Sequence, residues 1–304
     1  MNTALSIDSI SIDAKPLRSA SVQHWAELIS DIYKEQGIVL FRDLIANTDI
    51  AKVQAELSFV IGLAISKLRR QRKLPTEGAL RNAHRFDAGM LDLCAADRTV
   101  GGEVFRVAKK LLSVQRLTTC AIFENISAAL IGTDKVALHP MGTNVRADHP
   151  GETHYLYPWH QDYLYNLGSE DSVTFWSPLI DVDDVNGCIL IAPGSHKCGI
   201  FPVRADDPLN QRKNSAQSFS IANLDGVLVK FAQFSVPMKT GDVVAFHGNL
   251  LHSSQPNRSD GTRWSMQFRY FNIEAPDAIE RGWPGGAAEG FDFTKYHPEA
   301  IVCT

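Results

Sequence analysis

The sequence predicts a mainly β fold with flanking helices, in which an N-terminal helical scaffold precedes a double-stranded β-helix, the cupin-type jelly roll. Up to about residue 133, apolar side chains recur at the three- and four-residue spacing of helices that bury one face. From Val136 onward, short β-rich segments alternate with Pro, Gly, Asn and Asp, as in a barrel or jelly roll. Because β-barrels with added helices often reach this length, we expect one domain over residues 1–304. It divides into a helical scaffold (1–133), a jelly-roll core (134–273) and a C-terminal loop or lid segment (274–304).

The composition predicts a soluble, cytoplasmic protein that binds small molecules. Hydrophobic residues make up 44% and charged residues 21% of the chain, as in ordinary globular domains, and the net charge of −4 argues against a nucleic-acid partner. The five cysteines form no CxxC pair, which favours reduced thiols. The N-terminus lacks the pattern of a signal peptide, and no apolar run reaches the ~18 residues of a membrane span. We therefore expect a small-molecule substrate, with no nucleic acid and no membrane as partner. The sequence gives no indication of the oligomeric state.

The scaffold is expected to begin with a helix over residues 21–36, which Ser21 caps and Gly37 ends. A short buried strand, 38–41, follows this helix. Apolar spacing predicts further helices, which are 47–68, 101–116 and 119–131. These elements form a support for the β-rich part of the chain.

Five cations stand within seven residues at the end of the second expected helix, in the run from Lys67 to Lys73. Such a run is typical of a solvated helix end, where positive charges offset the helix dipole. The alternative is a clamp for an acidic group of the substrate. Residues 81–90 are too irregular to assign, and we expect His84 among them to be a surface or structural residue.

Alternating and β-branched segments predict the strands of the core, which are 134–147, 153–162, 172–181, 187–192, 226–236, 241–248 and 263–273. Two further stretches, 203–226 and 274–300, are polar or rich in Gly, Pro and aromatic residues. Long loops without structure of their own are often lids or binding loops. We expect these two stretches to gate the substrate.

The segment Trp159-His160-Gln161-Asp162 carries the predicted chemistry. Side chains two residues apart on a strand point the same way, so His160 and Asp162 would present an imidazole and a carboxylate to one spot. A third ligand must come from elsewhere, and the run that starts at Gly241 ends with His247 and His252. Either imidazole would complete a set of two histidines and one carboxylate, which suits a non-haem Fe(II) oxygenase.

A possible carboxylate clamp lies downstream of these histidines. On the last expected strand Arg263 and Ser265 share one face and could hold a carboxylate through a guanidinium and a hydroxyl. A metal triad followed by such a clamp indicates an acidic co-substrate.

From about Asn144 to Phe271 the chain resembles the phytanoyl-CoA dioxygenase-like family of Fe(II)/2-oxoglutarate-dependent oxygenases. The matching motifs are His160-Gln161-Asp162, Val173-Thr-Phe-Trp176, the stretch from Asp183 to Pro193-Gly194-Ser195-His196, and Gly241-Asp242 leading to His252 and Arg263. In the family, the distal metal histidine precedes the 2-oxoglutarate arginine by about eleven positions. His252 fits this spacing and His247 does not. His196 follows a turn and lacks a carboxylate two residues away, so we expect it to shape the loop over the site and not to bind the metal.

The resemblance implies a role for each matching residue. The metal ligands and catalytic residues would be His160, Asp162 and His252. The residues that bind 2-oxoglutarate would be Arg263, Ser254, Ser265, Trp176 and Asn144. Candidate substrate contacts, chosen from their places beside these residues, are Arg146, Tyr157, Gln161, Tyr163, Gln267 and Arg269.

The implied activity is hydroxylation of an aliphatic carbon of a small molecule, with Fe(II), 2-oxoglutarate and O2 as cofactor and co-substrates and with release of succinate and CO2. Asp162 favours hydroxylation over halogenation, because related halogenases have a small residue in place of this carboxylate. Desaturation, cyclisation and epimerisation use the same iron chemistry and stay open. A non-catalytic or isomerase-type metal-binding cupin is the alternative from another class, since a fold alone does not define a function.

Overall fold

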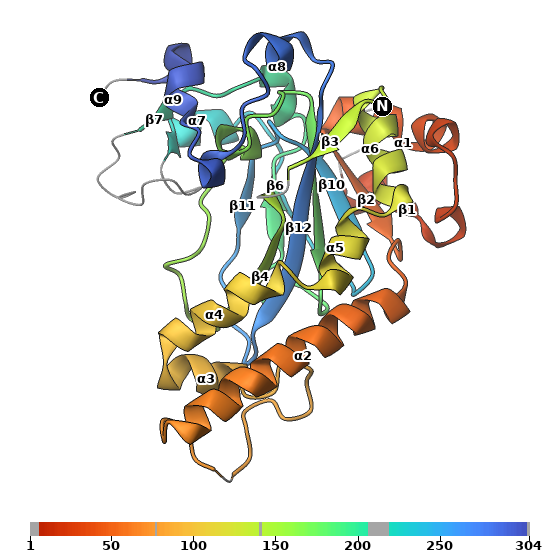
Figure 1. The fold of residues 1–304 in the computed structure, drawn as a ribbon. Coiled ribbons are helices and arrows are strands. Elements are labelled where there is room, and N and C mark those ends of the chain that lie inside the picture. Colours follow the sequence, from red (N-terminus) through yellow and green to blue (C-terminus); the bar gives the residue numbers. More distant parts are fainter. Residues whose placement is uncertain (1–5, 77, 140–141, 206–218, 303–304) are drawn as a thin grey trace.

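The computed structural model describes residues 6–76, 78–139, 142–205 and 219–302. Helices cover one side of a large sheet, and a smaller sheet lies on its other side (Figure 1). The helices are α1 (Val22–Gln36), α2 (Asn47–Arg70), α3 (Met90–Ala96), α4 (Arg98–Ala108), α5 (Leu112–Thr118), α6 (Ala121–Ile131), α7 (Leu224–Leu228), α8 (Pro276–Glu280) and α9 (Phe293–Tyr296). In the described part of the chain, no helix has the length and apolar character needed to cross a membrane.

The strands form one large and two small sheets. They are β1 (Ser11–Asp13), β2 (Ile38–Arg42), β3 (Val136–Leu138), β4 (Asn144–Asp148), β5 (Ser172–Pro178), β6 (Ile189–Ile191), β7 (Val203–Arg204), β8 (Ser220–Ile221), β9 (Phe234–Val236), β10 (Val243–His247), β11 (His252–Ser254) and β12 (Arg263–Asn272). The seven-stranded sheet has the order β1-β2-β10-β5-β12-β3, with β4 also paired to β12. The three-stranded sheet is β11-β6-β9, and β7 pairs with β8. In the described residues, no strand ladder joins the two larger sheets into a closed barrel.

The outer face of the large sheet packs against the helical scaffold. Strand β12 contributes every second residue to this core, namely Trp264, Met266, Phe268 and Tyr270. Helix α6 lies against β5, β12 and β3, while α4 lies against β4. In Figure 1, α2 crosses the lower end of the large sheet with α3 and α4 beside it. Burial of this continuous apolar surface holds the scaffold to the sheet.

A second apolar core fills part of the space between the two larger sheets. Ile38, Leu40, Trp176, Val244 and Phe246 come from the large sheet, and Ile189, Ile191 and Val236 come from the small sheet. The two sheets therefore face one another, and polar residues elsewhere on these inner faces are enclosed between them.

The scaffold follows most of the sequence-based expectations. Ser21 caps α1 by accepting a hydrogen bond from the His24 amide, and Gly37 ends the helix with a φ of 72°. The predicted helix 101–116 is instead two helices, α4 and α5, separated by residues 109–111. Helix α3 was missed, because its seven residues are too few to display a helical period.

The basic run at the end of α2 has structural partners. Lys67 pairs with Glu103 at 2.6 Å and Lys73 pairs with Asp97 at 2.6 Å, so these two cations fasten α2 to α4 and its cap. The contacts support the interpretation as a helix end. His84 is exposed, as expected of a surface residue. Four cysteines, Cys94, Cys120, Cys188 and Cys198, are free thiols, and Cys303 lies outside the described residues.

Four points about the predicted β-rich part and C-terminal segment need correction. The predicted strand 153–162 is a series of turns with one isolated bridge at His160, and the predicted strand 226–236 begins as helix α7 and is extended only over β9. Strand β11 was not predicted, because it is only three residues long. Residues 274–300 are not a bare loop, since they contain α8, α9 and short 3-10 helices. Of the expected loop 203–226, residues 206–218 lie outside the described residues.

Candidate metal centre

His160, Asp162 and His252 come together between the two sheets. The Nε2 atoms of His160 and His252 lie 3.5 Å and 3.7 Å from Oδ1 of Asp162. The two imidazole rings are 4.2 Å apart between centroids, and one ligand atom from each of the three residues lies within 4.8 Å of the others. All three side chains are buried. A set of two imidazoles and one carboxylate in this arrangement can hold a divalent metal ion.

Backbone pairing brings the two histidines together. The amide of His160 donates to the carbonyl oxygen of His252 at 3.0 Å, and the amide of His252 donates back at 3.1 Å. Each ring uses Nδ1 against a carbonyl oxygen two residues earlier, Pro158 at 2.8 Å and Leu250 at 3.0 Å. Because a carbonyl oxygen only accepts, each Nδ1 carries the proton and each Nε2 keeps its lone pair for a metal.

Asp162 reaches this position by a route that the sequence did not indicate. It begins a 3-10 helix, Asp162–Tyr165, and is not on a strand with His160. The backbone of Gln161 between them is extended, so the two side chains still converge over this short distance. The prediction that His160 and Asp162 share one strand was therefore wrong. The prediction that their side chains lie close together is confirmed.

The second carboxylate oxygen of Asp162 is held by two neighbours. Thr174 donates to Oδ2 at 2.8 Å, and Arg269 donates to the same atom through Nε at 2.9 Å. Burial raises the pKa of Asp162, but the positive charge of the Arg269 guanidinium outweighs this effect and holds the pKa well below its usual value. The carboxylate is therefore ionised and oriented, with Oδ1 turned toward the histidines. Arg269, expected to contact the substrate, serves to position Asp162.

His247 lies outside this cluster. It ends β10, its Nδ1 accepts a hydrogen bond from the Asn249 amide at 3.0 Å, and its ring lies near those of Tyr33 and His196. Burial lowers its pKa to about 4, so it is a neutral side chain packed against helix α1. Burial likewise lowers the pKa of His252, to about 3. His196, in the 3-10 helix Ser195–Cys198, donates a hydrogen bond from Nε2 to the Lys34 carbonyl oxygen and lies away from the triad.

The inner face of β12 bears a row of polar residues. Arg263, Ser265, Gln267 and Arg269 alternate with the apolar residues of the outer face, and all four are buried. Gln267 is paired with Trp176 of β5 on one side and with Asn144 of β4 on the other. The expected 2-oxoglutarate residues Arg263, Ser265, Trp176 and Asn144 therefore lie on one continuous surface.

Arg263 is partly engaged within the protein. Its NH2 pairs with Oδ2 of Asp148 at 2.6 Å, and its NH1 donates to the Gly187 carbonyl oxygen. The Nε of Arg263 and the hydroxyl of Ser265 are buried and, among the described residues, have no hydrogen-bond partner. Ser254 lies on β11 two residues after His252, so it shares that histidine's face. Buried donors without a partner are costly, and a carboxylate group would satisfy both.

Two of the expected substrate contacts have structural roles. Gln161 is fully buried, and its amide donates to the carbonyl oxygens of Gly199 and Asn249, while its oxygen accepts from the Phe201 amide. Tyr163 turns into a separate core and bonds His297 at 3.0 Å through its hydroxyl. Both were expected to contact the substrate because they stand next to the metal ligands in sequence, but Gln161 is turned into the protein and Tyr163 lies in the 3-10 helix Asp162–Tyr165.

Arg146 and Tyr157 do lie beside the triad. The guanidinium of Arg146 stands 4.3 Å from the centroid of the Tyr157 ring, which is in turn 5.5 Å from the His160 ring. Arg146 pairs with Oδ1 of Asp148 at 2.6 Å, so Asp148 bridges Arg146 and Arg263. Asp148 was not among the predicted site residues, although its place two residues after Arg146, directly after the predicted strand 134–147, was an available signal.

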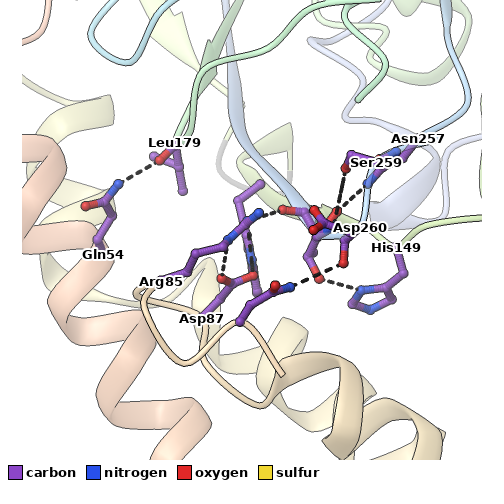
Figure 2. Close-up of polar contacts among 12 residues, drawn as sticks. Gln54, Arg85, Asp87, His149, Leu179, Asn257, Ser259 and Asp260 are labelled. Atoms are coloured by element: carbon purple, nitrogen blue, oxygen red, sulfur yellow. Dashed lines mark hydrogen bonds and ion pairs between the residues drawn. The ribbon is translucent and has the colours of Figure 1, made fainter. Parts of the chain in front are cut away.

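A polar cluster fastens the start of β12 to the scaffold. Figure 2 shows Arg85 and Asp87 reaching toward the loop that carries Asn257, Ser259 and Asp260. Asp87 accepts from the Trp264 indole at 2.9 Å, and Arg85 donates to the Thr262 carbonyl oxygen at 2.6 Å. These contacts flank Arg263 on both sides in sequence. Residues 81–90 had no assignable pattern, because their order comes from this distant strand.

Known proteins with similar sequences are dioxygenases and hydroxylases. The family model described as phytanoyl-CoA dioxygenase matches residues 33–265. The peroxisomal phytanoyl-CoA dioxygenase of Bos taurus is 24% identical over 78% of this chain and 66% of its own length, so the chain spans just under two thirds of that relative. The L-proline trans-4-hydroxylase of Streptomyces griseoviridis is 25% identical over 79% of this chain and 84% of its own length.

Solved structures with a similar fold include an epimerase and a carbocyclase. The epimerase SnoN, crystallised with Fe3+, alpha ketoglutarate and nogalamycin RO, has a TM-score of 0.53 and 19% identity, over 82% of this chain and 84% of its own. The alpha ketoglutarate-dependent carbocyclase SnoK has a TM-score of 0.50 and 17% identity, over 88% and 94% of the two chains. At these identities the likeness concerns the fold. Because the family model covers more than half of the chain, the protein belongs to the phytanoyl-CoA dioxygenase family of Fe(II)/2-oxoglutarate-dependent oxygenases.

Proposed function

We propose that the protein is an Fe(II)- and 2-oxoglutarate-dependent oxygenase that hydroxylates an aliphatic carbon of a small molecule, with release of succinate and CO2. The observation that carries the proposal is the convergence of two imidazole Nε2 atoms and one carboxylate oxygen in a buried space. In this proposal His160, Asp162 and His252 hold Fe(II), which together with 2-oxoglutarate and O2 supplies the oxidising chemistry. The two facing sheets would be the halves of a double-stranded β-helix, in one domain with the C-terminal segment over it.

The 2-oxoglutarate site would lie along the inner face of β12. Arg263 would bind the distal carboxylate of 2-oxoglutarate through the Nε group that lacks a partner, and Ser265 would donate its unpaired hydroxyl. Ser254, Trp176 and Asn144 would complete the walls of this site. The apolar surface beside Trp176 would keep water away from the reacting groups.

The identity of the reaction rests on two considerations. Asp162 is present and held in place by Thr174 and Arg269, so no ligand position is vacated for a halide. Named hydroxylases stand among the relatives, including the 1-deoxypentalenic acid 11-beta-hydroxylase of Streptomyces arenae, which is 33% identical over 45% of this chain. Epimerisation or ring closure would need the same residues and a different placement of the substrate.

The deciding experiment is spectroscopic. Under nitrogen, addition of Fe(II) and 2-oxoglutarate together should produce the weak visible charge-transfer band of the chelate, and neither compound alone should do so. Exposure to air with a substrate panel should then release succinate. Failure to form the band would place the protein among metal-binding cupins without 2-oxoglutarate chemistry.

A further inference from the structure

The inner faces around the candidate metal centre carry an excess of positive charge. On β4, β12 and the segment of Asp162, the ionised side chains facing this space are Arg146, Asp148, Asp162, Arg263 and Arg269. Three cations and two anions leave a formal charge of +1. The two triad histidines add nothing to this sum when they are neutral, as metal ligands must be.

The proposed cofactors leave this excess unchanged. Fe(II) would bring two positive charges and 2-oxoglutarate two negative charges, so their sum is zero. A charge enclosed between protein layers is costly unless it is paired, and the described residues on these faces offer no further carboxylate. The remaining positive charge therefore needs an anion that neither the protein nor the cofactors supply.

Arg146 is the arginine with room for that anion. Arg269 uses Nε, NH1 and NH2 on Asp162, Gly142 and Gln267. Arg146, in contrast, makes both of its hydrogen bonds within the described structure through NH2, to Asp148 and to the Tyr155 carbonyl oxygen. Its side chain keeps 15% of its surface exposed. Its Nε and NH1 groups are therefore available beside Tyr157, whose ring adjoins that of His160.

We infer that the primary substrate carries one carboxylate, which the guanidinium of Arg146 binds beside the metal centre. The inference rests on the proposed function and specifies its substrate class. A carboxylate on Arg146 would place the rest of a small substrate across the Tyr157 ring toward His160. Two N–H groups of one guanidinium can bind both carboxylate oxygens, which fixes the direction of the substrate as well as its charge.

The test compares acids with their neutral amides. Calorimetry under nitrogen on the Fe(II)/2-oxoglutarate complex would measure binding of hexanoate, cyclohexanecarboxylate, benzoate and phenylacetate, and of the four matching primary amides. We expect at least one acid to bind about tenfold more tightly than its amide, which corresponds to about 1.4 kcal/mol of binding free energy. Equal binding of acids and amides, or no binding by any of the acids, would overturn the inference.

Variants locate the binding group. Arg146→Met should remove the preference for acids while the affinity for 2-oxoglutarate stays the same, and Arg146→Lys should restore part of the preference. Arg42→Met is the matched control, because Arg42 also pairs with a buried aspartate, Asp242 at 2.7 Å, on the large sheet away from the centre. An unchanged preference in Arg146→Met would overturn the assignment to Arg146. The visible band of the Fe(II)/2-oxoglutarate chelate is measured first. Absence of the band would contradict the proposed function, whereas a normal band without a preference for acids would contradict only the role of Arg146.

Discussion

The two faces of β12 show how one strand can serve stability and chemistry at once. Trp264, Met266, Phe268 and Tyr270 on the outer face are buried against the helices, whereas the residues between them face the candidate metal centre. Polar and apolar residues alternate strictly from Arg263 to Tyr270, because each side chain of a strand points opposite to its neighbours. Substitutions on the inner face should therefore change ligand binding, and substitutions on the outer face should change the free energy of unfolding.

The largest effect should come from the inner side, at a metal ligand. His252→Ala should lose stoichiometric Fe(II) and all turnover, because one of three protein ligands is removed. His247→Ala on the outer side should keep the metal and at least part of the activity. Iron content after gel filtration and succinate release measure the two properties. Asp162→Ala should behave as His252→Ala does, and undiminished turnover in it would exclude the proposed triad.

The contribution of the outer face to stability can be tested by a substitution that leaves a cavity there. Phe268→Ala should lower the free energy of unfolding by about 3–5 kcal/mol, because the ring is fully buried between Phe123 and Phe175. Urea unfolding followed by circular dichroism measures this. Phe59→Ala is the control, since Phe59 is 68% exposed and its removal should change stability little. A similar loss in both variants would contradict the division between the faces.

Arg263, on the inner face, should control the affinity for 2-oxoglutarate. Arg263→Ala should raise the concentration of 2-oxoglutarate needed for half-maximal rate by roughly one to two decades, because a charge-assisted pair is worth about 1.5–3 kcal/mol. Iron binding should be retained. Arg258→Ala, at an exposed position nearby, is the control. If Arg263→Ala binds 2-oxoglutarate as tightly as the parent does, another cation is the clamp.

The smallest effect is a pH dependence on the outer side. Burial lowers the pKa of His247 to about 4 from 6.5, so the unfolded chain binds a proton in this interval and the folded chain does not. Stability should therefore fall as pH decreases below about 6.5 and the decrease should end near 4. At pH 5 the proton uptake of His247 in the unfolded chain should lower the free energy of unfolding by about 2 kcal/mol. His247→Gln should make the stability curve flatter between pH 7 and 5, and an identical slope would contradict the assignment.

The sequence predicted what depends on regular periods. Polar and apolar residues alternate over the first eight residues of β12, so the spacing of Arg263 and Ser265 predicted that they share one face of the strand. Helix α1 was defined by Ser21 and Gly37, whose capping roles are local. The third metal ligand was different, because the alternation of side chains along a strand could not decide between His247 and His252. Their separation contains a change of strand from β10 to β11, and only the resemblance to a family supplied the choice.

Contacts between distant segments could not be predicted in this way. Asp162 stands on a 3-10 helix that is fixed by the bonds of Thr174 and Arg269 to its carboxylate. The irregular residues 81–90 are ordered by Trp264 and Thr262, which are more than 170 positions later in the chain. Neither arrangement leaves a periodic trace in the local sequence, so each needed three-dimensional information.

The reciprocal backbone bonds between His160 and His252 affect how the protein acquires its metal. They set the spacing of two ligands through main-chain atoms, which are not themselves metal ligands. The loss of conformational entropy that accompanies assembly of the site therefore belongs to folding and not to metal capture. A chelator should consequently strip the ion while the chain keeps its native circular dichroism, and added Fe(II) should rebind without a refolding phase.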